Sequence, residues 1–467
     1  MNKRLAWSDY SQWLKDNLIK LPETQEAPLP HSFCIDSRLV GKDQWFVAIK
    51  GTRVDGHDYI ESALDNGASG IIVEKESLPK LSARALKKAL VLLDNVKGLG
   101  QIAGGYCSLY QDITLVALTG SVGKTTTKEM LAHILQNMGE VLFSQGNFNN
   151  ELGLPLTLFK LKPTHKFVVL EMGARKPGDI KQLLPIAQPN ITIFLNAKES
   201  HLEIFRTREA LFATKTEIIY ASKPDCKIAC TSDDSRLDIV SLRKDRKVCS
   251  FGTKTADVTL GQVTWQADSI HFDLSYQGKL ASFHIPKAHS AYPINWAAAT
   301  AAAILAGTNF ESLPLLASSF IGTNRRFQTY EVGPLTLIDD AYNASPTSML
   351  AGFETLKARF GETAKQLVLG DMLEIGDDWP MQHEKIGRLC QEILAPTLLI
   401  TIGERAKWMQ KAAIAAGLAP ERTAHFTSVL NLIEQRQTAL PKSGLLYLKG
   451  SNAMQLGKLV DNLLTEK

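Results

Sequence analysis

A glycine-rich segment between an apolar run and a helical pattern carries the clearest chemistry in the sequence. Residues 113–118 are largely apolar, as in a buried parallel strand, and apolar positions after Lys124 recur at helical spacing. A strand, a glycine loop and a helix N-terminus form a phosphate cradle, because backbone N–H groups and the helix dipole face the oxygens. Leu118 stands where the full P-loop pattern has its first glycine, and a tight turn with an exposed lysine is the alternative. We predict a nucleotide site formed by Gly120, Ser121, Val122, Gly123, Lys124, Thr125 and Thr126.

Polar side chains follow the next two apolar runs. Glu171 comes directly after residues 167–170, and His201 lies in the loop beyond residues 191–195. Functional groups of open α/β sheets gather at the carboxyl ends of parallel strands, so Glu171 is placed to coordinate Mg²⁺ directly or through water. His201 is either a ligand on the same sheet edge or a structural histidine, and the sequence leaves both interpretations open.

An asparagine-rich loop, residues 146–153, separates the glycine loop from Glu171. Asparagine side chains both donate and accept hydrogen bonds, so this loop can hold a polar substrate, although a plain turn fits the composition equally well. The candidate residues are Asn147, Asn149 and Asn150.

Lys215 interrupts an apolar stripe on the predicted helix 208–220. A buried lysine must lose its charge or find a partner. Three interpretations follow. Lys215 forms a salt bridge with Glu171 or another acid, or it is carbamylated by CO₂, which needs the neutral amine that burial favours, or it snorkels to the surface.

The two ends of the chain offer further polar loops. Near the N-terminus, Asp36-Ser37-Arg38 and the loop 50–58 could bind a phosphate or a sugar, or could simply be solvated. In the C-terminal part, three predicted strands end in the polar segments 339–346, 370–374 and 449–451. Because these strand ends share one edge of a sheet, we expect them to face a ligand cleft.

The composition is that of an ordinary globular protein. Of the 467 residues, 45% are hydrophobic and 21% are charged, and the net charge is only +4, so nothing indicates a nucleic-acid or membrane surface. The six cysteines are scattered and form no Cys-x-x-Cys or Cys/His cluster, which favours reduced thiols over a zinc site. The N-terminus has no apolar core of signal-peptide length, and residues 297–307 are too few to span a membrane. We therefore expect a cytoplasmic protein.

Length and patterning predict three α/β domains. A small mixed α/β domain covers residues 1–96, and its apolar residues between Leu5 and Ile19 suggest one face of a helix. The central domain, residues 97–322, has a P-loop ATPase-like parallel sheet followed by an antiparallel hairpin or meander and an alanine-rich helix. The C-terminal domain, residues 323–467, alternates strands and helices as a Rossmann-like doubly wound sheet. The predicted strands are 32–35, 44–49, 70–73, 113–118, 167–170, 191–195, 335–338, 366–369, 397–402 and 445–448.

Taken together, the motifs resemble those of the Mur ligases, a family of ATP-dependent peptide-bond-forming enzymes of bacterial cell-wall synthesis. The resemblance covers all three predicted domains. Its motifs are Asp36-Ser-Arg, Phe46-Val-Ala-Ile-Lys-Gly, Asp55-Gly-His-Asp, Gly120-Ser-Val-Gly-Lys-Thr-Thr-Thr-Lys, Gly146-Asn-Phe-Asn-Asn-Glu-Leu-Gly, Glu171-Met-Gly-Ala, His201-Leu-Glu, Asp340-Ala-Tyr-Asn-Ala, Leu369-Gly-Asp-Met-Leu-Glu and Lys449-Gly-Ser.

The resemblance implies a role for each motif. The glycine loop would hold the phosphates of ATP, while Asn295, Arg326 and Asp340 match positions that hold adenine, phosphate and ribose respectively. The implied magnesium ligands are Thr125, Glu171, His201 and Lys215, the last as a carbamylated lysine, and the implied catalytic residues are Lys124, His201 and Lys215. The implied substrate-binding residues are Ser37, Arg38, Lys50, Gly51 and Thr52 for a UDP group, Asn147, Asn149 and Asn150 in the asparagine loop, and Tyr342, Asn343, Ser345, Lys449 and Ser451 for the acceptor.

Within the family, two features favour UDP-N-acetylmuramoyl-tripeptide as the donor and D-alanyl-D-alanine as the acceptor. The asparagine loop goes with the tripeptide donor, and the Asp-Asn-Pro-Arg motif of ligases that add a diamino acid is missing. A monomer with no nucleic-acid or membrane partner is expected. The alternatives are a Mur-type ligase with another amino-acid acceptor, folylpolyglutamate synthetase, against which Asp36-Ser-Arg argues, and a non-catalytic P-loop nucleotide switch.

The sequence also departs from the family pattern. Ala291 and Tyr292 stand where relatives usually have His-Asn, which affects the inference about adenine binding. Ser345 replaces an asparagine and Asn452 replaces a frequent arginine, which weakens the inference about how the acceptor is held.

Overall fold

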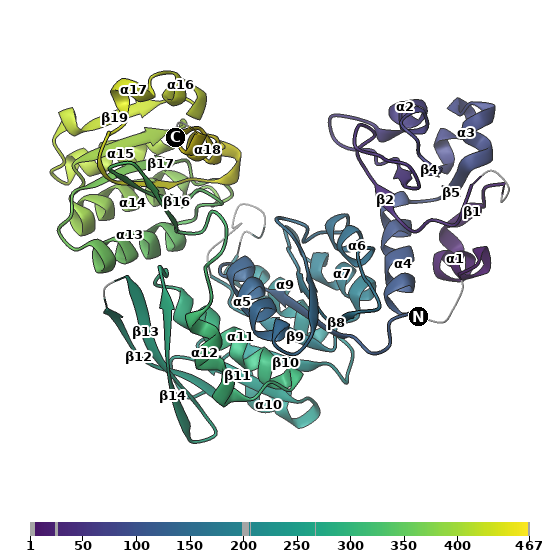
Figure 1. Cartoon of the computed structure of the whole chain (residues 1–467), viewed down its shortest axis with the longest axis horizontal. Helices are drawn as coiled ribbons and strands as arrows, with labels where there is room; N and C mark the ends of the chain where they lie inside the picture. Colours follow the sequence, from purple (N-terminus) through teal and green to yellow (C-terminus); the bar gives the residue numbers. More distant parts are fainter. Residues whose placement is uncertain (1–4, 24–26, 199–204, 206, 267, 466–467) are drawn as a thin grey trace.

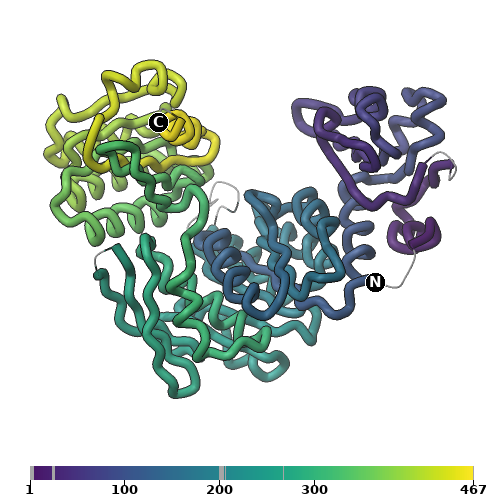
Figure 2. The backbone as a smooth tube through the Cα atoms, in the orientation of Figure 1, coloured from purple at the N-terminus to yellow at the C-terminus, as the bar shows by residue number. Residues whose placement is uncertain are grey.

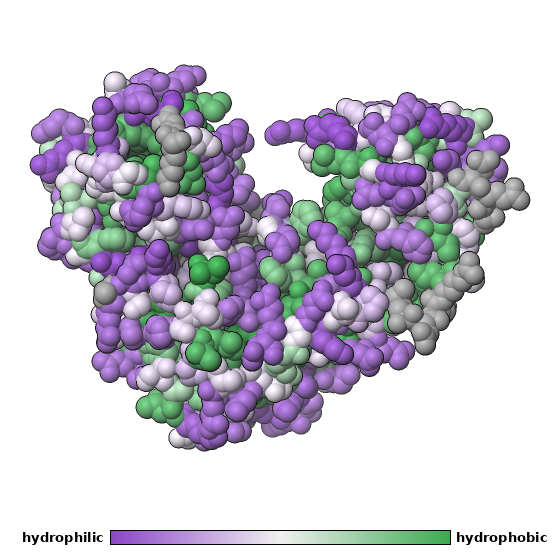
Figure 3. Space-filling model, in the orientation of Figure 1, coloured by the Kyte–Doolittle hydropathy of each residue, from purple (hydrophilic) through white to green (hydrophobic). Residues whose placement is uncertain are grey.

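The chain folds around three β-sheets that follow one another along the sequence, one in each predicted domain (Figure 1). This computed structural model describes residues 5–23, 27–198, 205, 207–266 and 268–465. The N-terminal and C-terminal lobes stand on opposite sides of the central domain (Figure 2), and a deep hollow separates them in the space-filling view of Figure 3. No helix among the described residues combines the length and the apolar character needed to cross a bilayer. The predicted three-domain α/β fold is confirmed.

The N-terminal lobe has a five-stranded sheet in the order β1-β5-β4-β3-β2, parallel except for β1. The predicted helix with an apolar face from Leu5 to Ile19 is wrong in its second half. The helix ends at Leu14, whereas Leu18 and Ile19 lie in β1. Lys15 closes the helix at a φ of 48°, and Leu18 then pairs with Leu92 of β5. The elements are α1 Trp7–Leu14, β1 Leu18–Lys20, β2 Phe33–Cys34, β3 Trp45–Val47, α2 Ile60–Asp65, β4 Gly70–Glu74, α3 Ala83–Lys88, β5 Ala89–Leu92 and α4 Asn95–Cys107.

The central domain has a nine-stranded sheet in the order β14-β13-β12-β11-β10-β9-β6-β8-β7. Its strands are parallel from β7 to β12, and β12, β13 and β14 form the predicted antiparallel part. The alanine-rich helix α11 packs on the sheet beside α5, since small side chains allow close approach. The elements are β6 Thr114–Thr119, α5 Lys124–Gln136, β7 Glu140–Phe143, α6 Gly153–Leu158, β8 His165–Glu171, α7 Asp179–Ala187, β9 Ile191–Phe194, α9 Arg208–Tyr220, β10 Lys227–Thr231, α10 Ile239–Asp245, β11 Val248–Gly252, β12 Val258–Gln266, β13 Ser269–Tyr276, β14 Lys279–Pro286, α11 Tyr292–Ala306 and α12 Leu313–Ser318.

The C-terminal lobe has a six-stranded sheet in the order β15-β16-β20-β17-β18-β19, parallel except for the edge strand β15. Helices cover both faces, as in a doubly wound sheet, and each face has its own apolar core. The elements are β15 Gln328–Val332, β16 Leu335–Asp340, α13 Pro346–Phe360, β17 Lys365–Gly370, α14 Trp379–Leu394, β18 Leu398–Ile402, α15 Ala406–Ala415, β19 Thr423–Phe426, α16 Val429–Glu434, α17 Arg436–Ala439, β20 Gly444–Lys449 and α18 Gly457–Thr465.

Specific contacts join each lobe to the central domain. On the C-terminal side, Ser290 donates its N–H to Thr355 Oγ1 (2.9 Å) and its hydroxyl to the carbonyl of Ala351 (3.0 Å). Arg359 of α13 also forms an ion pair with Asp268 in the turn after β12. On the N-terminal side α4 packs against α1 and against α6 and α7, and the predicted division after residue 96 falls in its first turn.

Candidate active site

A cavity of about 2650 Å³ opens where the three domains meet. It extends from α1 and α4 of the N-terminal lobe, past the loop between β6 and α5, to the loops that follow β16, β17 and β20. Most of the predicted site residues are among those lining it. These are Ser121, Val122, Gly123, Lys124, Thr125, Thr126, Asn147, Asn149, Asn150, Glu171, Lys215, Asn295, Arg326, Tyr342, Asn343, Ser345 and Ser451.

The glycine loop passes from β6 into α5 with the geometry that its sequence requires. Gly123 has a φ of 85°, and a Cβ at this position would fall 2.5 Å from Asn295 Oδ1, so only glycine fits. Gly120 lies behind the cavity wall, where a Cβ would meet Leu195 Cβ at 2.8 Å. The Lys124 ammonium donates to the carbonyls of Gly120 (2.8 Å) and Ser121 (3.2 Å), and desolvation lowers its pKa.

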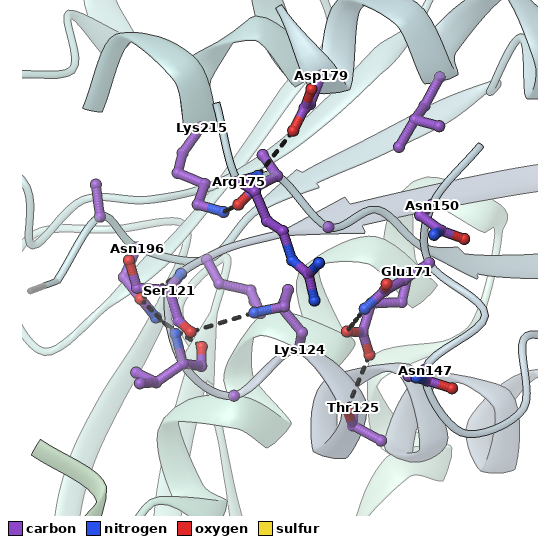
Figure 4. A pocket seen from close by; sticks show the side chains of 18 of the residues that line it. Ser121, Lys124, Thr125, Asn147, Asn150, Glu171, Arg175, Asp179, Asn196 and Lys215 are labelled. Carbon is purple, nitrogen blue, oxygen red and sulfur yellow. Dashed lines mark hydrogen bonds between the residues drawn. The ribbon is translucent and has the colours of Figure 1, made fainter. Parts of the chain in front are cut away.

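Asn196 holds this loop from the segment that follows the neighbouring strand β9, and its role is not predicted from the sequence. Its Oδ1 accepts from the N–H groups of Ser121 and Val122, both at 3.2 Å, and its Nδ2 donates to the Val122 carbonyl at 3.1 Å. Figure 4 shows Asn196 directly beside Ser121. The available signal was its place one residue beyond the apolar run 191–195.

Glu171 forms the centre of an oxygen cluster at the end of β8. The Thr125 hydroxyl donates to its Oε2 (2.8 Å) and the Asn149 amide donates to its Oε1 (2.9 Å), and the side chain is only 3% exposed (Figure 4). A carboxylate and a hydroxyl are hard oxygen ligands of the kind that Mg²⁺ takes together with phosphates and water. The donor set therefore fits Mg²⁺.

Lys128, one turn into α5, supports this cluster from behind. Its ammonium is fully buried and donates to the Ser144 carbonyl (2.6 Å), while the Ser144 hydroxyl accepts from the N–H of Glu171 (3.1 Å). Burial lowers the pKa of Lys128, and the negative charge of Glu171 acts in the opposite direction.

Lys215 is almost fully buried on α9, with 1% of its surface exposed. The interpretation that it snorkels to the surface is therefore wrong. Its ammonium lies 3.4 Å from the carbonyl of Ala174, and no described acidic side chain lies within salt-bridge distance. Burial, followed by the charge of Lys124, lowers the pKa of Lys215 to about 7. A large neutral fraction at physiological pH is what carbamylation requires. His201, the other predicted ligand in this region, lies outside the described residues.

Two residues of the C-terminal part reach the oxygen cluster around Glu171. Arg326 donates from Nη2 to Thr125 Oγ1 (3.2 Å), and its guanidinium stacks 4.2 Å from the centre of the Tyr342 ring. The C-terminal lobe therefore touches the same hydroxyl that Glu171 binds.

Other predicted residues of this lobe have partners within the protein. Asp340 and Lys449 form an ion pair of 2.7 Å, are 4% and 3% exposed, and lie behind the cavity lining. The Ser345 hydroxyl accepts from Ser348 N as the N-cap of α13, and that of Ser451 accepts from Leu373 N (2.8 Å).

The predicted UDP-binding residues lie apart from this cavity. Arg38 is exposed and its guanidinium forms two hydrogen bonds with Asp36, while Ser37 is buried. The loop with Lys50, Gly51 and Thr52 closes through a bridge between Lys50 and Asp55. None of these side chains is part of the described cavity lining.

Comparison with known families finds Mur ligase domains along most of the chain. The model described as "Mur ligase family, catalytic domain" matches residues 30–106. "Mur ligase middle domain" matches residues 118–303, and "Mur ligase, glutamate ligase domain" matches residues 325–452.

Individual proteins match over nearly their whole length. The chain is 30% identical to the UDP-N-acetylmuramoyl-tripeptide–D-alanyl-D-alanine ligase of Bacillus subtilis, with 94% of each chain covered. It is 29% identical to the protein of that name from Synechocystis sp., over 100% of this chain and 99% of the relative. Among solved structures it is similar to MurF from Acinetobacter baumannii, with a TM-score of 0.85 at 29% identity over 98% of both chains. It is also similar to MurF ligase from Thermotoga maritima in complex with ADP, with a TM-score of 0.79 at 27% identity over 96% of this chain and 100% of that one.

Proposed function

The chain belongs to the Mur ligase family, and from this we propose that it joins D-alanyl-D-alanine to UDP-N-acetylmuramoyl-tripeptide at the expense of ATP. The observation that carries this function is the end-to-end similarity to ligases of that name, which extends through the C-terminal lobe where the acceptor would bind. The products are the UDP-N-acetylmuramoyl-pentapeptide, ADP and phosphate. We propose that the reaction belongs to peptidoglycan precursor synthesis in the cytoplasm.

The ATP phosphates would lie in the loop between β6 and α5. Backbone N–H groups from Gly123 to Thr126 face the cavity at a helix N-terminus, where anions bind favourably. Lys124 would turn from the loop carbonyls toward the transferring phosphate. Asn295 and Arg326 line the same cavity and are proposed to contact the adenine and a phosphate, with Asp340 behind them toward the ribose.

The shape of the cavity suits an elongated donor. The UDP group would bind in the N-terminal lobe at Ser37, Arg38 and the loop 50–52, and the peptide would extend along α4 toward the asparagine loop. Asn147, Asn149 and Asn150 would then contact the peptide near its reacting carboxylate. The acceptor would approach from the C-terminal lobe, where Tyr342, Asn343, Ser345 and Ser451 line the cavity and Lys449 shapes it from behind.

Two steps complete the reaction. A carboxylate oxygen of the donor attacks the γ-phosphorus, the bond to the bridging oxygen of ADP breaks, and an acyl phosphate forms. The amine of the acceptor then attacks the acyl carbon, phosphate leaves, and the nitrogen loses a proton. Thr125, Glu171, His201 and a carbamylated Lys215 would hold Mg²⁺, which supplies charge neutralisation on the phosphates. The lobes must exclude water during the second step, since the acyl phosphate hydrolyses readily.

A phosphate-release screen tests this function. The purified protein is given ATP, magnesium and one UDP-muramoyl-peptide, and each candidate amine is added separately. We expect release with the tripeptide donor and D-alanyl-D-alanine. Faster release with L-alanine, D-glutamate or diaminopimelate and its shorter donor would assign another Mur-type reaction, and no donor-dependent release would indicate a nucleotide switch.

A further inference from the structure

Arg175 lies in the loop between β8 and α7 and takes no part in the site described so far. Figure 4 shows its side chain extending into the cavity from the side opposite Ser121, Lys124 and Thr125. Its guanidinium is exposed and makes no hydrogen bond or ion pair with the described residues. Arg326, by contrast, binds the hydroxyl of Thr125. Arg175 is therefore an available cation facing the phosphate cradle.

The loop that carries Arg175 is fixed by hydrogen bonds of its backbone. Asp179 Oδ2 accepts from the N–H groups of Arg175 (2.8 Å) and Lys176 (3.0 Å). The preceding carbonyl, that of Ala174, accepts from the buried ammonium of Lys215 (3.4 Å). The guanidinium thus starts from an anchored main chain, which limits the entropy lost when it binds a ligand.

A second carboxylate holds the following residues in the same way. Glu217 of α9 accepts from the N–H groups of Gly178 (2.7 Å) and Lys181 (3.0 Å) through its two oxygens. The acids around this loop therefore bind backbone N–H groups and leave the Arg175 side chain available.

The proposed reaction needs a cation on this side of the cavity. The donor carboxylate and the γ-phosphate are both anions, and they must come into contact for the phosphoryl group to transfer. The P-loop and Lys124 serve the phosphate from one side. A guanidinium on the opposite side can bind both carboxylate oxygens at once, because its N–H groups form a planar fork and its charge is permanent.

We propose that Arg175 binds the reacting carboxylate of the peptide donor and orients it toward the γ-phosphate. This inference rests on the proposed function, since it takes the donor to be a UDP-muramoyl-peptide. It makes Arg175 a donor-binding residue of the first chemical step, with no part in holding the nucleotide.

Trapping of the acyl phosphate by hydroxylamine isolates this step, because it needs no acceptor. Wild type, Arg175→Gln and Arg175→Lys are assayed with ATP, magnesium and UDP-N-acetylmuramoyl-tripeptide, and KM is measured for the donor and for ATP. Lys181→Gln is the matched control, since it removes an exposed positive charge from the adjoining helix but does not line the cavity. We expect Arg175→Gln to lower kcat/KM for the donor by roughly 100-fold, as for loss of one preorganised electrostatic contact. Arg175→Lys should recover only part of this loss, and the KM for ATP should be unchanged.

The possible results separate the two proposals. If wild type forms hydroxamate and Arg175→Gln keeps the wild-type kcat/KM for the donor, the role of Arg175 is wrong while the proposed function stands. A selective rise in the KM for ATP in Arg175→Gln would also overturn the proposed role of Arg175, since this residue would then bind the γ-phosphate. If wild type forms no hydroxamate with this donor, the proposed function itself fails.

Discussion

The central and C-terminal sheets place acidic and basic side chains at equivalent edges but use them differently. At the end of the central strands, Glu171 accepts from a hydroxyl and an amide, and Lys124 donates to loop carbonyls, so neither charge is neutralised by the other. At the end of β16 and β20, Asp340 and Lys449 neutralise each other in a buried ion pair. Both edges satisfy the rule that functional groups gather at the carboxyl ends of parallel strands.

The difference shows what decides whether such a group is available to a ligand. A charge that is solvated by neutral donors and lines a cavity can exchange those donors for a phosphate or a metal ion. A charge paired inside the protein cannot leave without exposing its partner to an apolar environment. We therefore expect the central edge to govern catalysis and the Asp340–Lys449 pair to govern the stability of the C-terminal lobe.

The largest expected effect is a loss of stability at the edge of the C-terminal sheet that carries the Asp340–Lys449 ion pair. Among the described residues, Lys449→Met leaves the buried Asp340 carboxylate with Tyr447 as its remaining side-chain donor, and should lower the free energy of unfolding of the C-terminal lobe by about 3–5 kcal/mol. The free energy of unfolding is measured by urea titration, with hydrogen exchange of the amides in β16 and β20 as the readout. The double variant with Asp340→Asn should regain part of the loss. Unchanged stability in Lys449→Met would show that the two edges do not differ as described.

The matching change at the central edge should affect turnover with little effect on stability. Lys124→Ala removes the cation that we propose neutralises the transferring phosphoryl group, and should lower kcat by about 10²–10³-fold. Thermal unfolding should stay close to that of wild type, because the side chain is only partly buried. Near-normal turnover in a folded Lys124→Ala protein would remove the central edge from the mechanism.

Lys215 tests whether the central edge carries a lysine carbamate in addition to the carboxylate of Glu171. If it is carbamylated and holds the metal, Lys215→Ala should lose activity by about 10–100-fold or more, and acetate or formate should restore part of it. The intact mass measured in bicarbonate should include the carbamate. An active enzyme whose lysine is unmodified under those conditions would rule out the modification.

The smallest expected effect is a pH dependence of the stability of the C-terminal lobe. His383 is fully buried, its Nε2 accepts from Met372 N (3.0 Å), and burial lowers its pKa to about 4. The folded state therefore binds fewer protons than the unfolded state between pH 6.5 and 4. This contribution to stability is complete above pH 6.5 and falls by at most about 1.4 kcal/mol per pH unit on acidification.

Hydrogen exchange of peptides covering residues 370–390 follows this change. In His383→Gln the side-chain amide oxygen can still accept from Met372 N, but it does not titrate. The hydrogen-exchange protection of these peptides should therefore depend less on pH in this variant than in wild type. Identical pH profiles for the two proteins would show that His383 does not report on this edge.

Local patterns predicted the elements well where both ends had clear signals. The helix predicted over 208–220 matches α9, since Thr207 caps its first turn and an apolar stripe runs along it. The helix expected up to Ile19 was wrong because the sheet partner of Leu18 lies far away in the chain. β10 and β11 are absent from the predicted strands, although their neighbours on both sides were predicted.

The site was predictable to the extent that its motifs are local. The glycine loop and Glu171 were predicted to lie at one edge of the sheet because each follows its own strand, and the structure places them together there. Asn196 and Arg175 were not predicted as site residues. Each lies in a loop that comes close to the glycine loop only when the sheet has folded. The pairing of Asp340 with Lys449, 109 residues apart, could not be read from either motif.

The identity of the product tests the central claim most directly. UDP-N-acetylmuramoyl-tripeptide, D-alanyl-D-alanine, ATP and magnesium are incubated with the protein, and the nucleotide-linked products are analysed by mass spectrometry. We predict the UDP-N-acetylmuramoyl-pentapeptide, formed in equal amount to ADP and phosphate and absent in Lys124→Ala. ATP hydrolysis without any pentapeptide, or a product carrying a different amino acid in a competition among amines, would contradict the proposed function.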